Sequence, residues 1–131
     1  MMRRGTPEAD LQRAVVQALR IALPRTAIIH HCANEVTEAG PRGAKRQAIL
    51  VGMGVHAGFA DLIVISGGRV LFLEVKSQTG RLRKSQEVFR DTIIAQGFGW
   101  ALVRTIDDAL GALADHGFTS RVQLPGRRVS P

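Results

Sequence analysis

Two acidic side chains and a lysine stand at the ends of two apolar runs in the sequence. Asp61 opens the first run, LIVIS, and Glu74 and Lys76 close the second, which begins after Gly67-Gly68. A Gly-Gly pair between two such runs is typical of the two-residue turn of a β-hairpin. Counted outward from that turn, Asp61 faces Glu74, which predicts Cβ atoms about 4.5–5.5 Å apart on one face of the sheet.

Two ionised carboxylates at this separation repel each other, and the cost rises when a sheet interior removes water from around them. A cation between them relieves the repulsion, and Mg2+ takes one or two carboxylates with water and phosphate oxygens at about 2.0–2.1 Å. Lys76 lies on the same face as Glu74, roughly 6–7 Å along the strand, within reach of such a water or phosphate. On an exposed strand Glu-x-Lys is usually only a solvated ion pair. A facing aspartate in a buried hairpin has no such routine use, which favours a metal site.

The elements that must hold this hairpin alternate between helices and strands. A helix is expected to start at Thr6, which can cap it, with Pro7 in its first turn. Residues 34–46 are polar, Gly-rich and basic, which predicts a loop before a short helix that ends at Gly52 or Gly54. The remaining elements are a strand at TAIIHHC, a helix at LRKSQEVFRDTIIAQG, a strand at WALVR and a helix at TIDDALGALADHG.

This order of elements indicates an α/β fold, and the 131 residues are expected to form one domain. The second hairpin strand, 70–75, is apolar on both faces, so helices should cover both sides of the sheet. Its crossover to WALVR should join parallel strands, which makes the predicted sheet a mixed one. The basic tail, about 120–131, is expected to fray.

Composition narrows the class of protein. The formal net charge of +7 and the pI near 11.2 favour a polyanionic partner. No apolar run approaches the roughly 20 residues of a membrane span, and no apolar signal region follows the first arginines, so a cytoplasmic protein is expected. Cys32 is the only cysteine and fits a reducing compartment. His30 and His31 are neighbours on a predicted strand and point to opposite faces, which disfavours a zinc site.

Several segments resemble the PD-(D/E)xK nuclease signature and, more narrowly, the virus-type replication-repair nuclease (VRR-NUC) domain of small stand-alone phage and bacterial proteins. The segments are PEADLQ, GVHAGFADLIV, FLEVKSQTGRLRKSQEVF and GFGWALVRTIDDAL, and they extend from about Glu8 to Leu113. The resemblance implies a restriction-endonuclease-like core, in which a mixed sheet carries the active site on a hairpin and has helices on both faces. Ala60 departs from the pattern, because the family usually has proline there, but proline supplies no ligand.

The resemblance also implies roles for individual residues. Those that would bind a divalent metal, Mg2+ with Mn2+ as a substitute, are Asp61, Glu74, Glu8 and the backbone carbonyl of Val75. Lys76 would orient the attacking water or help to deprotonate it, and Gln86 would support Lys76. Without the resemblance, Glu8 is simply a favourable charge at a helix N-terminus and Gln86 a capping candidate. No organic cofactor is expected.

Two basic clusters flank the predicted site in the sequence. Phosphate contacts need such side chains, although charge runs are often only solvated surface. The chain has no tyrosine and few other aromatic residues, so backbone and shape recognition is favoured over base stacking. The clusters are Arg42, Lys45 and Arg46 in the predicted loop, and Arg81, Arg83 and Lys84 after the Glu-x-Lys strand.

Together these features predict a metal-dependent DNA endonuclease that is selective for branched DNA, like Holliday-junction resolvases, in a bacterial or phage-infected cell. Two symmetric cuts need two sites, so a homodimer is expected. Apolar residues that the sheet core does not need could supply its interface, namely Ile49, Leu50, Val51 and Met53. The alternatives are a nuclease of the same fold that nicks flaps or cuts RNA, and a non-catalytic DNA-binding module.

Overall fold

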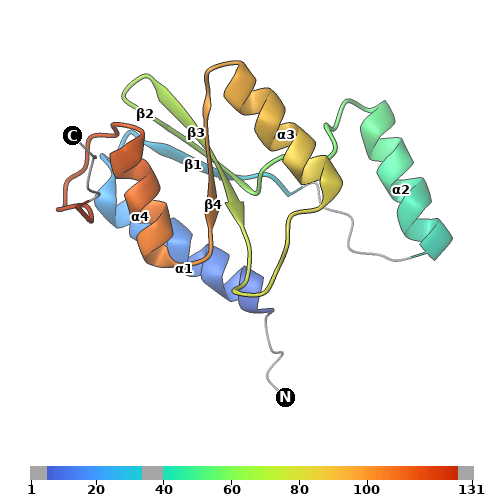
Figure 1. The fold of residues 1–131 in the computed structure, drawn as a ribbon, viewed down its shortest axis with the longest axis horizontal. Helices are drawn as coiled ribbons and strands as arrows, with labels where there is room; N and C mark the ends of the chain where they lie inside the picture. The colour runs from blue at the N-terminus through green and yellow to red at the C-terminus, as the bar shows by residue number, and fades with distance from the viewer. Residues whose placement is uncertain (1–5, 34–39, 127–131) are drawn as a thin grey trace.

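The computed structural model describes residues 6–33 and 40–126, which form four helices and four strands (Figure 1). The elements in chain order are α1 (Pro7–Ala22), β1 (Ile28–His31), α2 (Gly40–Gly52), β2 (Leu62–Ser66), β3 (Arg69–Val75), α3 (Lys84–Ala95), β4 (Gly99–Val103) and α4 (Ile106–Asp115). The strands form one sheet in the order β1-β2-β3-β4, with β3 and β4 parallel and the other neighbours antiparallel. The predicted mixed sheet is therefore confirmed. None of the helices described is long and apolar enough to cross a bilayer.

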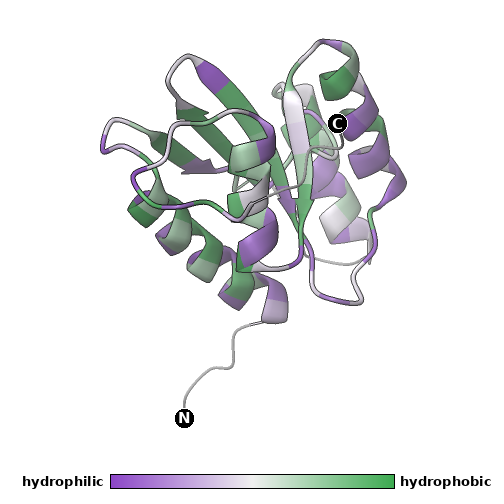
Figure 2. Ribbon diagram, turned by 60° about the vertical axis from the view of Figure 1, so that its left-hand side comes forward, coloured by the Kyte–Doolittle hydropathy of each residue, from purple (hydrophilic) through white to green (hydrophobic). Residues whose placement is uncertain are grey.

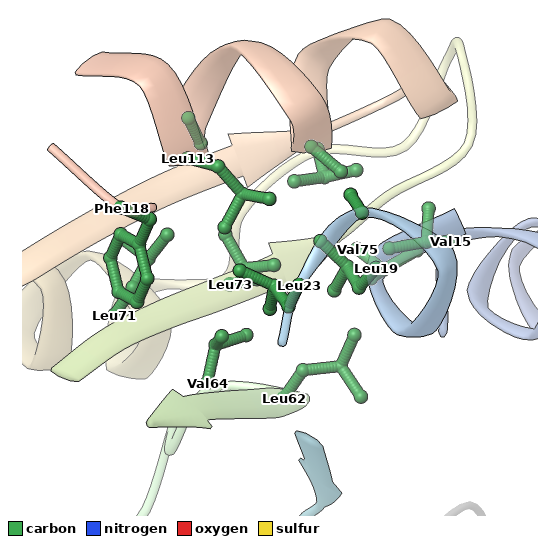
Figure 3. Packing of buried hydrophobic residues seen from close by; sticks show 14 residues of the cluster. Val15, Leu19, Leu23, Leu62, Val64, Leu71, Leu73, Val75, Leu113 and Phe118 are labelled. Atoms are coloured by element: carbon green, nitrogen blue, oxygen red, sulfur yellow. The ribbon is translucent and has the colours of Figure 1, made fainter. Parts of the chain in front are cut away.

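Helices cover both faces of this sheet, as the apolar character of β3 predicts. On one face, residues from α1 and α4 pack on β2, β3 and β4 in a core that includes Val15, Leu19, Leu73 and Leu113 (Figure 3). On the other face, α3 packs through Phe89 against aromatic and aliphatic side chains of the sheet. Hydrophobic and hydrophilic residues alternate along the helices, whereas large parts of the strands are hydrophobic (Figure 2). This difference follows because a helix buries one stripe and a covered strand buries both sides.

The start of α1 follows from its first residues. The Thr6 hydroxyl accepts a hydrogen bond from the Ala9 amide at 3.1 Å, and Pro7 occupies the first turn, where its missing N–H costs nothing. This cap fixes where the helix begins, and therefore which side chains of its first turns face the sheet.

The β2–β3 hairpin has the register that the Gly-Gly turn predicts. Gly67 and Gly68 have φ angles of +60° and +77°, as a two-residue turn of this hand requires. Ser66 pairs with Arg69, and the ladder continues to the pair Leu62 and Leu73. Asp61 directly precedes β2, one position beyond this last pair, and Glu74 is the next residue of β3.

One predicted loop is instead largely helical. Residues 34–39 lie outside the described residues, but α2 begins at Gly40, so Arg42, Lys45 and Arg46 lie on a helix rather than on a loop. Pro41 suits a first helical turn, and the residues AKRQA that follow Gly43 are good helix formers. Their helix propensity outweighs the destabilising effect of the glycines in this segment. The helix projects away from the sheet (Figure 1).

The first residues of the predicted tail are hydrogen-bonded to the end of α1. The Arg121 amide donates to the Ala22 carbonyl at 2.6 Å, and its guanidinium donates to the carbonyls of Arg20 and Ile21 at 2.9 and 3.1 Å. Ser120 adds a hydroxyl hydrogen bond to the Ala22 carbonyl. These contacts satisfy the last carbonyls of α1, which otherwise have no helical partner. Residues 127–131 lie outside the described residues.

Candidate active site

Asp61 is held from two sides at the point where β2 begins. Its carboxylate Oδ2 accepts a hydrogen bond from the Val75 amide at 2.8 Å, and its backbone carbonyl accepts one from the Cys32 amide at 2.8 Å. The first contact comes from β3 and the second from the residue that follows β1. The half-buried carboxylate is therefore fixed relative to three neighbouring strands.

Glu74 is buried in the sheet, with 1% of its surface exposed. Its Oε1 accepts a hydrogen bond of 2.9 Å from the Gln86 side-chain amide, which comes from the first turn of α3. The carbonyl oxygen of the same Gln86 amide accepts from the Arg83 backbone at 2.8 Å, so that the residue also caps its helix. Gln86 thus orients the carboxylate of Glu74, where the resemblance implied support of Lys76. The Gln86 side chain therefore caps α3 and holds Glu74 at the same time.

Lys76 extends the pairing of β3 with β4 by one residue, because its amide donates to the Val103 carbonyl at 3.0 Å. Only 8% of its surface is exposed, which is unusual for lysine. Strand alternation directs its side chain to the same face as Glu74. A lysine with so little exposed surface, two positions from a buried glutamate, is not the solvated surface pair that Glu-x-Lys usually forms.

A cleft of about 450 Å³ lies where the strands end beside the first turns of α1. Its lining residues are Thr6, Glu8, Ala9, Gln12, Arg13, His31, Asp61, Val75 and Lys76. The cleft therefore brings Glu8 together with three of the residues predicted around the hairpin. Glu74 and Gln86 do not line the cleft, but Glu74 is the chain neighbour of Val75, which does, and Gln86 is hydrogen-bonded to Glu74. A water takes about 30 Å³ of liquid volume, so the space admits a phosphodiester with several waters.

The cleft also contains Gln12, Arg13 and His31, which the sequence did not single out as site residues. Gln12 lies one turn after Glu8, so the i, i+4 spacing could have placed it on the same helix face. Arg13 is its neighbour and forms an ion pair with Asp10 at 3.2 Å. His31 pairs with Leu62, the residue after Asp61, but this position depends on the pairing of β1 with β2. No local pattern in the sequence predicts that pairing.

The donor atoms in and beside the cleft are chemically suited to a hard divalent cation. They are the carboxylates of Asp61, Glu74 and Glu8 and the backbone carbonyl of Val75, and oxygen ligands of this kind fit Mg2+ or Mn2+. Within residues 6–33 and 40–126, no three His, Cys, Asp or Glu side chains form a group that could hold a metal. Such a site would thus rely on one or two carboxylates with waters and phosphate oxygens, as Mg2+ sites commonly do.

Cys32 lies next to this group without the properties of a nucleophile. Burial raises the pKa of its thiol, and the nearby negative charge of Asp61 raises it further. A raised pKa keeps the thiol protonated near neutral pH, and the thiolate is the reactive form. Cys32 therefore contributes to the site through its backbone amide.

The loop after Lys76 is tied to the end of β4. The Arg104 guanidinium donates to the Ser77 carbonyl and, at 2.7 Å, to the Gly80 carbonyl. The Arg104 amide in turn donates to the Asp108 carboxylate at 2.9 Å in α4. This loop carries the exposed Arg81 and Arg83 and leads into Lys84, the first residue of α3. The second basic cluster is therefore held beside the strand that bears Lys76, while the first projects on α2.

Gly58 sets the distance between the start of the hairpin and α3. Its φ is +75°, and a Cβ placed on it would lie 2.1 Å from the Ser85 carbonyl oxygen. Only glycine allows this approach, because any side chain would overlap the backbone of the first turn of α3. The same turn carries Gln86, so Gly58 fixes how Gln86 meets Glu74.

Comparison with known proteins identifies a similar fold. No protein-family model matches the chain, and a comparison with curated proteins finds no match. Among solved structures, a "VRR_NUC domain protein" superposes with a TM-score of 0.59 at 22% sequence identity, covering 87% of this chain and 90% of that one. The chain thus has the fold of a VRR-NUC domain protein over most of its length, consistent with the predicted PD-(D/E)xK-like core.

Proposed function

We propose that the protein is a metal-dependent nuclease that hydrolyses phosphodiester bonds in DNA. The observation that carries this proposal is the hydrogen bond from the Val75 amide to the Asp61 carboxylate, because Val75 lies between the buried residues Glu74 and Lys76. Buried charges in proteins are commonly paired or bind metals. The fold shared with a VRR-NUC domain protein supports the same reading.

The residues present fit a divalent metal at the strand ends. Asp61, Glu74 and the Val75 carbonyl would hold it, and Glu8 would reach it through water from the wall of the cleft. When bound, Mg2+, or Mn2+ in its place, lowers the pKa of a coordinated water and polarises the phosphoryl oxygen.

The chain's own side chains supply position and charge. Gln86 holds the Glu74 carboxylate through its amide, and the Val75 amide holds Asp61, so neither acid has to reorganise when substrate binds. Lys76 orients the attacking water and favours its deprotonation, because its ammonium stabilises the developing negative charge. Arg13, at the rim of the cleft, places a positive charge where the DNA backbone would pass.

Branched DNA is the proposed substrate, with Holliday junctions as the favoured structure. The net charge of +7 favours a polyanion, and two basic clusters on separate elements can contact separate duplex arms. The aromatic side chains Phe59, Phe72 and Phe89 pack against one another and are not spread along a groove. Recognition of the backbone and of its shape is therefore favoured over base stacking.

Incubation with plasmid and with a four-way junction tests the activity. Cleavage is expected with Mg2+, loss of cleavage with a chelator, and recovery when Mg2+ is restored. Flap DNA and single-stranded RNA, incubated in parallel, distinguish the related alternatives. Binding without cleavage of any of these substrates, with either Mg2+ or Mn2+, would support the non-catalytic module instead.

The outer face of α2 is proposed as a DNA contact. Arg42, Lys45 and Arg46 are all exposed on the first turns of this projecting helix. Replacing the three with alanine should weaken binding to all sequences alike and reduce the salt slope by up to about 0.9 per lost phosphate contact. Fluorescence titrations at several salt concentrations measure this slope. The matched control replaces Arg20, in the last turn of α1, and Arg25, in the turn that follows this helix; both are exposed, and the slope should be unchanged.

The far end of the same helix is proposed as the homodimer contact. Met53 is 78% exposed, and Ile49 and Val51 are also exposed, whereas Leu50 is partly covered and its carbonyl accepts the Val55 amide. One chain carries one site, and a junction requires two related by a two-fold axis, so a second copy is the partner that fits.

The dimer is expected at micromolar concentration, and Met53→Asp should dissociate it. The variant should lose paired cutting of a junction while still nicking single strands. Light scattering measures the mass, with Ile94→Asp, an exposed apolar position on α3, as the control. A wild-type monomer that still makes paired cuts would contradict the link between assembly and activity.

A further inference from the structure

We infer that His31 donates a hydrogen bond to a phosphate oxygen of bound DNA, with Gln12 setting the ring in the required tautomer. This inference rests on the proposed function, because it concerns the same cleft, and it adds a substrate contact from the end of β1. Neither residue belongs to the metal-binding group.

The placement of His31 relative to Asp61 is fixed by the backbone. His31 is the last residue of β1 and pairs with Leu62, the neighbour of Asp61. The next residue, Cys32, donates its amide to the Asp61 carbonyl at 2.8 Å. His31 and Asp61 line the same cleft. A phosphate held near Asp61 is consequently beside the imidazole.

The hydrogen bond with Gln12 determines which ring nitrogen can donate. The Gln12 side-chain amide donates to His31 Nδ1, so Nδ1 supplies a lone pair and the proton of the neutral ring is on Nε2. No residue in the described part of the chain forms a hydrogen bond with Nε2. A second ring nitrogen that carries a proton is a suitable donor to a phosphate oxygen.

His30 provides a natural comparison on the same strand. It is exposed like His31, but it pairs with Ile63, and strand alternation directs it to the opposite face. It does not line the cleft. Both residues are exposed histidines on the same strand, and they differ in their position relative to the cleft.

The test compares four variants in cleavage with Mg2+ and in DNA binding with a chelator. His31→Ala should lower kcat/KM and affinity about ten- to a hundredfold, the range for a hydrogen bond to a charged group. His31→Gln should recover much of the loss, because its terminal amide nitrogen reaches the position of Nε2. His31→Asn, whose amide imitates only Nδ1, should not. His30→Ala should behave as wild type.

Two further readouts separate a phosphate contact from a structural role. The salt slope of binding should be unchanged in His31→Ala, because a neutral donor releases no counterion. The thermal unfolding midpoint should stay within about a degree of wild type, because the exposed pair adds little to stability. Equal behaviour of His31→Ala and His30→Ala, or of the Gln and Asn variants, would overturn the inference. If wild type binds but does not cut, the proposed nuclease fails, and the binding comparison alone decides whether His31 contacts the phosphate.

Discussion

Replacing Asp61 with asparagine is expected to slow DNA cleavage about a thousandfold, since a metal ligand contributes several kcal/mol to the transition state. DNA binding should be unchanged or tighter, because a negative charge near the phosphates is removed. The asparagine carbonyl can still accept from the Val75 amide, so the fold should be retained. Single-turnover cleavage of a labelled junction and a titration in chelator measure the two effects.

Glu74→Gln should give the same result for the same reason, because the Gln86 amide can still donate to the new side-chain carbonyl. Asp107→Asn, an equal change of charge in the exposed first turn of α4, is the control and should cut at the wild-type rate. Cleavage at that rate by either Asp61→Asn or Glu74→Gln would show that the metal is bound elsewhere.

Gly58→Ala adds a single methyl group, and near the site it should be the glycine-to-alanine change that lowers stability most. The new Cβ would lie 2.1 Å from the Ser85 carbonyl oxygen at a φ of +75°. Overpacking and the left-handed backbone together should lower the free energy of unfolding by about 3 kcal/mol. Relief of the overlap moves the first turn of α3, so the Gln86 amide leaves Glu74 and cleavage should fall as well.

Gly67→Ala separates the two contributions, because Gly67 has a φ of +60° with no atom within 4 Å of an added Cβ. It should lose only about 1–2 kcal/mol from backbone strain. Denaturant unfolding of both variants measures the difference. Equal losses would mean that contact with α3 does not limit Gly58.

The parts of the site that could be predicted are those that local rules determine. The Gly67-Gly68 turn fixes the hairpin register, which brings Asp61 and Glu74 to the same end of the hairpin. The cap at Thr6 similarly fixes the first turn of α1 and so the direction of Glu8. Each of these follows from residues within a few positions of one another.

The rest depends on contacts between distant segments. The hydrogen bonds from Arg121 to the end of α1 join residues about a hundred positions apart. The basic sequence around Arg121 does not predict this contact. The wall formed by Gln12 and His31 likewise requires α1 and β1 to be assembled against the hairpin. For α2, glycines and charges suggested a loop, whereas helix propensity over the following residues prevailed.

The strand order β1-β2-β3-β4 repeats the order of the strands in the chain. Only β2 and β3 are joined by a two-residue turn, whereas a helix lies between β1 and β2 and another between β3 and β4, so the β2–β3 hairpin has the lowest cost of loop closure. Asp61, Glu74, Lys76 and Gln86 lie on one continuous segment, the hairpin followed by α3, whereas Glu8 and Gln12 arrive with α1. Transient fraying of the first turns of α1, ahead of the core residues Val15 and Leu19, would consequently widen the cleft without separating the two acids. Amide hydrogen exchange should then be faster in these first turns than in β3, so that access for DNA and local unfolding would use the same motion.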